Sequence, residues 1–163
     1  MINLIKSLGI TLKTVLRKPV TVQYPDEHLP MSPRYLGFPA LLWDDKVDEP
    51  ACTGCLVCAR YCPTDCITVS MKDNPLHAEG KSKRRKIVDD FEIRMERCIL
   101  CGICVEVCNF EAIEMSDYHE EADISRGGLI ATKEDLFRMG RDYQKRMGIV
   151  VGEAAKDDKE EEA

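Results

Sequence analysis

Eight of the nine cysteines fall into two runs that have the same spacing. The runs consist of Cys52, Cys55, Cys58 and Cys62, and of Cys98, Cys101, Cys104 and Cys108. Three thiolates at this spacing curl the backbone around one face of an iron–sulfur cube, and soft sulfur ligands suit iron that is held by sulfide. Backbone N–H groups then point at the sulfurs and tune the reduction potential. The two runs therefore predict two 4Fe-4S clusters.

The fourth cysteine of each run is expected to bind the cluster of the other run, as it does in ferredoxins with two clusters. The first cluster would be bound by Cys52, Cys55, Cys58 and Cys108, and the second by Cys98, Cys101, Cys104 and Cys62. Because each cluster takes a ligand from the opposite run, the two clusters must lie close together, which is what electron transfer requires. Gly54 and Gly102 allow the backbone to approach the clusters closely.

Other uses of cysteine fit the pattern less well. Structural zinc sites also use CxxC pairs, but zinc takes four ligands, usually from two pairs that a longer loop separates, so the further cysteines and Pro63 have no role there. Disulfides are typical of secreted proteins, and residues 1–20 lack the apolar core and cleavage site of a secretory signal. The ninth cysteine, Cys66, aligns with Ala112 in the second run. We expect it to be a small buried side chain, with a ligand or redox role as the alternative.

The composition is that of one ordinary domain, or of a small core with long extensions. Of the 163 residues, 44% are hydrophobic and only 6% aromatic, so metal centres would help to stabilise a modest core. A net charge of −6 argues against broad nucleic-acid binding. No stretch approaches the roughly 18 apolar residues that a membrane-spanning helix needs.

Residues 1–19 predict an amphipathic helix that Pro19 ends. One half carries Met1, Ile2, Leu4, Ile5, Leu8, Leu12, Val15 and Leu16, and the other carries Asn3, Lys6, Ser7, Lys13, Thr14, Arg17 and Lys18. Only Ile10 is out of place. A basic amphipathic helix suits a membrane surface or the apolar groove of a partner. Packing against its own domain is the alternative, and a mitochondrial transit peptide is disfavoured because the segment has a single arginine.

Residues 20–50 are expected to form an extended docking arm on another subunit. Prolines recur along the segment, at Pro25, Pro30, Pro33, Pro39 and Pro50. They forbid a long helix. Apolar side chains between Leu36 and Trp43 would anchor the arm, since a free loop would seldom carry so many.

Residues 51–117 predict a dicluster ferredoxin-like module of the α+β class with pseudo-two-fold symmetry. Residues 52–70 and 98–116 form an internal repeat at an offset of 46 residues. Each copy ends in an alternating segment typical of a strand, Ile67–Val69 and Ile113–Met115. Residues 87–88 and 91–93 predict a further strand that returns the chain to the second run.

The segments around the second copy are less informative. The loop 71–86 contains a basic run at 81–86, which we expect to be solvated or to contact another subunit, with a phosphate or nucleic-acid patch as the alternative. A C-terminal extension covers residues 118–152 and is compatible with a helix between Glu134 and Met147. Residues 153–163 form an acidic tail whose composition predicts disorder.

No other chemistry is indicated. His28, His77 and His119 are scattered, and we assign none of them to a metal. The chain has no dinucleotide-binding fingerprint, phosphate-binding loop or nucleophile–base pair, so we assign no catalytic residue and expect it to carry electrons. Asn109 stands where the first run has Pro63 and adds an N–H that proline lacks. We expect this donor to raise the potential of the cluster that Cys108 binds.

Taken together, these features resemble the iron–sulfur subunit I (TYKY) family of respiratory complex I, the proton-pumping NADH:quinone oxidoreductase. The resemblance runs from residue 1 to about 140 and goes beyond the cysteines. It includes the amphipathic N-terminus, the long loop between the runs, Tyr24-Pro25, Pro33-Arg34-Tyr35-x-Gly37 and Lys133-Glu134-Asp135-Leu136. Asn109 departs from the family pattern.

The resemblance implies an electron-relay subunit with no substrate site of its own. Its two 4Fe-4S clusters would take electrons from the large iron–sulfur subunit and pass them toward the terminal-cluster subunit and the quinone-site subunit. Residues 1–18 would hold it against the membrane arm and the membrane surface. The subunit would be peripheral, on the cytoplasmic face of the bacterial inner membrane.

Two alternatives stay open. The first is the equivalent subunit of a ferredoxin- or F420H2-dependent quinone oxidoreductase or of a membrane hydrogenase. The second is a freely soluble dicluster ferredoxin, to which the helix and the arm would be of no use.

Overall fold

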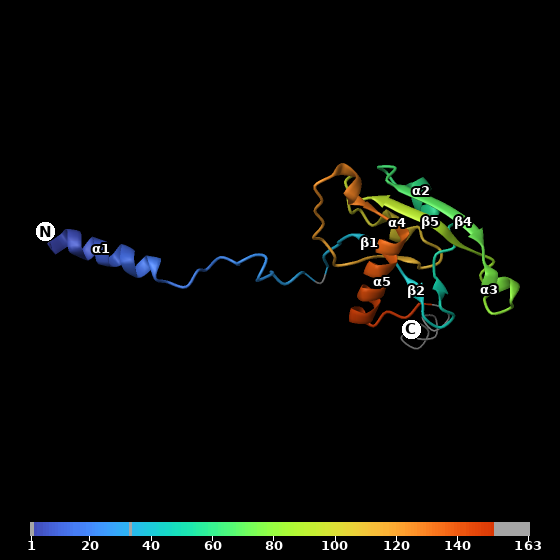
Figure 1. Cartoon of the computed structure of the whole chain (residues 1–163), viewed down its shortest axis with the longest axis horizontal. Helices are drawn as coiled ribbons and strands as arrows, with labels where there is room; N and C mark the ends of the chain where they lie inside the picture. The colour runs from blue at the N-terminus through green and yellow to red at the C-terminus, as the bar shows by residue number, and fades with distance from the viewer. Residues whose placement is uncertain (1, 33, 152–163) are drawn as a thin grey trace. The chain divides into compact units, whose positions relative to one another are not determined.

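The computed structural model describes residues 2–32 and 34–151, and the chain divides into two compact units, residues 1–33 and 34–163 (Figure 1). The first unit contains helix α1, Ile2–Val15. Its apolar side chains are exposed, and Leu4, Leu8 and Leu12 are each more than half accessible. After α1, residues 16–32 form no helix or strand. None of the helices in the described parts of the chain is long and apolar enough to cross a membrane.

The second unit is a mixed helix and sheet structure, as the α+β assignment predicted. Strand β4, Ile67–Asp73, pairs antiparallel with β5, Lys86–Arg94, and the end of β5 pairs with the short β7, Ile130–Ala131. Strand β6, Ile113–Met115, pairs instead with β1, Pro39–Leu41. The strands that end the two repeat copies, β4 and β6, therefore lie in different sheets. Two short helices, α2 (Val57–Tyr61) and α4 (Ile103–Glu106), occupy equivalent places in the copies and contact each other.

In the second half of the segment predicted to be a docking arm, the structure differs from the prediction. Residues 39–50 form strand β1 and a small hairpin of β2, Trp43–Asp44, and β3, Glu49–Pro50, all within the second unit. Pro39 begins a strand and Pro50 ends one, positions at which the missing N–H disrupts no ladder interior. Most of the apolar residues interpreted as anchors for another subunit instead belong to this unit's own core: Leu41 and Leu42 are buried, and Phe38 and Trp43 pack against the core, whereas Leu36 stays exposed.

The segment between the repeat copies is more ordered than the predicted loop. Strand β4 runs on to Asp73, and helix α3, Pro75–Ala78, follows with Asn74 as its N-cap. In the basic run, Arg84 turns inward, and its Nη1 lies 2.9 Å from Asp44 Oδ2 and 2.6 Å from Glu49 Oε1. Buried Asn74 and Ser82 also donate to Glu49. The pKa of Glu49 is lowered because these hydrogen bonds and Arg84 outweigh the effect of burial. Arg84 therefore ties the loop to the β2–β3 hairpin.

The C-terminal extension folds onto β1 and β2. Residues 126–129 form a 3₁₀ turn (η1, Arg126–Leu129), and helix α5 spans Lys133–Met147. Thr132 and Asp135 form a capping box at its start, and Gly148 ends it in the left-handed conformation. Leu136 and Phe137 are buried in the main core. The Gln144 side chain accepts from the N–H of Trp43 and donates to its carbonyl, both at 2.9 Å. The acidic tail lies outside the described residues.

Gly140 permits the close approach of α5 to β1, which gives a test of this packing. A Cβ at Gly140 would overlap the carbonyl group of Leu41. Backbone cannot rotate away as a side chain can, so we expect Gly140→Ala to destabilise the second unit by roughly 1–3 kcal/mol despite alanine's better helix propensity. Thermal unfolding followed by circular dichroism measures this as a fall of several degrees in the midpoint.

Gly127→Ala is the matched control, because a Cβ there meets nothing within 4 Å. Equal unfolding midpoints for the two variants would contradict the packing argument.

Candidate iron–sulfur centres

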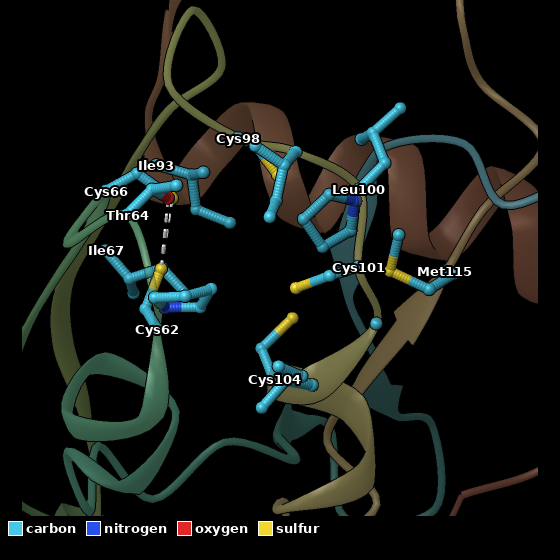
Figure 2. Close-up of a pocket in the computed structure, with 15 residues that line it drawn as sticks. Cys62, Thr64, Cys66, Ile67, Ile93, Cys98, Leu100, Cys101, Cys104 and Met115 are labelled. Atoms are coloured by element: carbon cyan, nitrogen blue, oxygen red, sulfur yellow. Dashed lines mark hydrogen bonds between the residues drawn. The ribbon is translucent and has the colours of Figure 1, made fainter.

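The eight cysteines of the two runs line two separate cavities. One cavity, here the Cys62 cavity, has Cys62 on its wall together with Cys98, Cys101 and Cys104. The other, the Cys108 cavity, has Cys108 together with Cys52, Cys55 and Cys58. The fold thus brings each fourth cysteine to the three cysteines of the opposite run. Figure 2 shows Cys62 facing Cys101 and Cys104 across the open space of its cavity.

The same four strands build both cavity walls. Each strand contributes one residue to the Cys62 cavity and, two positions away, one residue to the Cys108 cavity. These pairs are Pro39 and Leu41 of β1, Ile67 and Val69 of β4, Ile93 and Phe91 of β5, and Met115 and Ile113 of β6. Residues two apart on a strand share a face and lie roughly 7 Å apart. The two cavities are therefore neighbours on one apolar surface.

The backbone around the cysteines repeats the same unusual conformation in both copies. Left-handed residues occur at Gly54, Leu56 and Asp65, and again 46 positions later at Leu100, Gly102 and Glu111. The glycine stands first in one copy and second in the other, and a leucine occupies the remaining place. A left-handed leucine costs roughly 1–2 kcal/mol. Both copies adopt this conformation despite its cost, so the shape of the cysteine loop matters more than the conformational preference of leucine. Leu56 and Leu100 each line a cavity.

Most of the cysteine side chains are half-buried. Burial is the main reason that the pKa values of Cys52 and Cys104 rise to about 12 and that of Cys58 to about 11. Cys62 differs: burial raises its pKa, but hydrogen bonds from Cys66 and Thr64 outweigh this and lower it to about 7. Cysteine must lose its proton to bind a metal, so binding of a metal group releases protons here.

The residues present fit a cluster better than a single ion. All nine cysteines are free thiols. Within residues 2–32 and 34–151, no three His, Cys, Asp or Glu side chains are gathered tightly enough to hold one metal ion. Four cysteines instead surround an apolar space in each cavity. The Thr53 hydroxyl, on a residue of the Cys108 cavity wall, is buried without a hydrogen-bond partner among the described residues, so a sulfur of a bound cluster would supply an acceptor.

Backbone and side-chain donors reach individual cysteine sulfurs. The N–H of Gly54 donates to Cys52 Sγ and that of Ala112 to Cys108 Sγ, both at 3.4 Å. Asn109 is exposed and makes no hydrogen bond to Cys108 Sγ in the described structure, and its expected effect on the potential of the cluster stays a prediction. Cys66 is buried as expected, but its sulfur lies 3.4 Å from Cys62 Sγ, a contact that its alignment with Ala112 could not reveal.

No histidine of the described residues is on the wall of either cavity. His77 contacts the carbonyl of Ser82 through Nδ1, His119 lies near Glu120, and the ring of His28 lies against Tyr24. Thr64 is the residue that sequence reasoning missed. Its hydroxyl lies 3.5 Å from Cys62 Sγ, whereas the second run has a phenylalanine at the equivalent position. A comparison of the two copies residue by residue is the signal that would have identified it.

Known proteins resemble this chain in sequence. Residues 51–112 match the family model of the 4Fe-4S dicluster domain. NADH-quinone oxidoreductase subunit I 2 of Geobacter metallireducens is 39% identical over 82% of this chain and 95% of its own length. Subunit I 1 of Geobacter sulfurreducens is 41% identical over 82% of this chain and 94% of its own length. Subunit I 2 of Symbiobacterium thermophilum is 34% identical over 88% of this chain, which spans 58% of that relative.

A solved structure of an archaeal respiratory membrane complex, the membrane-bound sulfane sulfur reductase, contains a chain that is 27% identical, with 74% of this chain and 56% of that chain covered. Its TM-score of 0.42 is too low to establish a shared fold. The curated relatives, by contrast, align over most of this chain and, in the two Geobacter proteins, over nearly their whole length. The family resemblance predicted from the sequence is thereby confirmed, and the chain belongs to the NADH-quinone oxidoreductase subunit I family.

Proposed function

We propose that this chain is the electron-relay subunit of an NADH:quinone oxidoreductase and that it binds one 4Fe-4S cluster in each cavity. The observation that carries the proposal is the pair of adjacent cavities, each lined by three cysteines of one run and the fourth cysteine of the other run, with Cys66 as an additional cysteine on the wall of the Cys62 cavity. A 4Fe-4S cluster accepts and donates single electrons without a change of ligands. The chain requires no acid, base or nucleophile for this task.

The protein itself positions the two clusters and shields them from water. The cysteines hold the two cofactors at a spacing that the shared strands set. The apolar residues of β1, β4, β5 and β6 keep water out, which strengthens the effect of every nearby dipole on the potential. Gly54 and Ala112 direct N–H groups at the thiolates and partly offset their negative charge.

The first unit supplies the attachment to a larger assembly. Helix α1 carries Lys6 and Lys13 beside an exposed apolar face, and Arg17 and Lys18 follow the end of the helix. This combination favours a membrane surface or the apolar groove of a membrane subunit. We propose that it docks the subunit peripherally, on the cytoplasmic face of a bacterial inner membrane. There the clusters would lie between the large iron–sulfur subunit and the subunits that carry the terminal cluster and the quinone site.

Because each cavity takes its fourth cysteine from the opposite run, we can predict which cysteine variants alter the same EPR signal. Cys108→Ser should alter the same one of two cluster EPR signals as Cys55→Ser, because both residues line the Cys108 cavity. Cys62→Ser should alter the other signal, together with Cys101→Ser. Iron analysis should give about eight iron atoms per chain in the wild type and fewer in each variant. EPR spectra of the reduced full-length chain provide the measurement.

Ser125→Ala is a suitable control, because Ser125 is exposed and lies on neither cavity wall. If Cys108→Ser altered the same signal as Cys101→Ser, each run would bind its own cluster and the exchange of ligands would be refuted. A wild-type chain that binds zinc in place of iron and sulfide would refute the relay function itself.

The two-unit organisation predicts that cluster binding and assembly can be separated. Deletion of residues 1–33 should leave both EPR signals intact, because β1 and every cavity residue lie in the second unit. The same deletion should abolish co-purification with the membrane complex. A freely soluble ferredoxin would lose nothing by this deletion, so the result distinguishes the two functions.

A matched pair of full-length variants refines this test. Leu8→Gln with Leu12→Gln removes apolar surface from α1, whereas Ser7→Gln with Thr14→Gln places the same residue type on its polar half. We expect only the first pair to release the subunit from membranes. Equal retention of both pairs would show that the apolar face of α1 is not the contact.

A further inference from the structure

The two cavities differ at one ligand sulfur. In the Cys62 cavity, Thr64 Oγ1 lies 3.5 Å from Cys62 Sγ and Cys66 Sγ lies 3.4 Å from it. Figure 2 shows both side chains on the same side of the cavity as Cys62. A hydroxyl and a thiol can each donate to a thiolate, so Cys62 has two side-chain donors within reach when it is ionised.

The equivalent sulfur in the other cavity lacks both. The repeat offset of 46 places Phe110 opposite Thr64 and Ala112 opposite Cys66. Cys108 Sγ accepts from the backbone N–H of Ala112 at 3.4 Å, and no side chain of the described residues donates to it. The two copies keep the same left-handed backbone positions, so the contacts of Thr64 and Cys66 with Cys62 reflect the side chains that stand at these two places.

We propose that Thr64 and Cys66 raise the reduction potential of the cluster in the Cys62 cavity, so that an electron delivered to the pair rests there. This inference depends on the proposed binding of two clusters. A reduced cluster carries one more negative charge than an oxidised one, and donors aimed at a ligand sulfur stabilise the more negative state. Thr64 and Cys66 are thus positioning residues that act through Cys62.

The difference in reduction potential gives electron transfer between the two clusters a preferred direction. When one electron moves between the cavities, the cluster in the Cys108 cavity is oxidised and the cluster in the Cys62 cavity is reduced, and no bond forms or breaks. The donor side chains make this direction favourable.

EPR-monitored redox titration of the full-length chain tests the proposal. Thr64→Val removes the hydroxyl at nearly constant shape, and Cys66→Ala removes the thiol. Each change should lower the midpoint potential of the signal that Cys62→Ser alters. The expected size is up to about tenfold in the ratio of reduced to oxidised cluster, which is about 59 mV for one electron. Thr64→Ser keeps a hydroxyl and should restore the wild-type potential.

Two control variants separate this effect from a general destabilisation of the fold. Thr53→Val makes the same substitution in the wall of the Cys108 cavity and should leave the signal of the Cys62 cavity unchanged. Phe110→Thr supplies the missing hydroxyl near Cys108 and should raise the potential of the other signal. An unchanged potential in Thr64→Val would overturn the proposal, even if Cys66→Ala fails to incorporate its cluster. Absence of both cluster signals from the wild-type chain would instead refute the proposed function.

Discussion

The structure depends on one constraint, that each cavity takes its fourth cysteine from the opposite repeat copy. Cys62 and Cys108 can reach their cavities only if the two copies pack against each other, and α2 contacts α4 between them. The β1–β6 and β4–β5 pairings fix this arrangement, because each strand presents one residue to each cavity. Folding and cluster binding are therefore expected to stabilise each other, as they do where metal ligands are far apart in sequence.

Local strain around the cysteines is a second consequence of this arrangement. Leu56 and Leu100 are held in a conformation that glycine adopts freely, and several thiols are buried where ionisation is costly. Such costs persist only where the surrounding structure enforces them. Here the enforcing contacts are the apolar walls and the packing of α5, whose Gly140 lets the helix approach Leu41. The extension beyond the second copy thus supports the cluster module.

Some elements could be predicted because their signals are local. Ile113–Met115 alternates in polarity and forms a strand with those bounds, and the helix-compatible segment that begins near Glu134 forms α5. The strands β1, β2 and β3 could not be predicted, because each has only two or three residues and depends on partners far along the chain. Arg84 looked like part of a solvated basic run, but its charge is paired with Asp44 and Glu49, residues that sequence spacing does not connect to it.

The sequence by itself determined the chemistry of this protein: eight cysteines at two repeated spacings indicate iron–sulfur clusters, because spacing along the backbone controls which thiolates can share a cofactor. Only the tertiary structure decided how alike the two centres are. Cys62 has two side-chain donors beside its sulfur, whereas among the described residues only the backbone N–H of Ala112 donates to Cys108. A reduction potential depends on such directed contacts in space, and the cysteine pattern, which is the same in both runs, does not encode them.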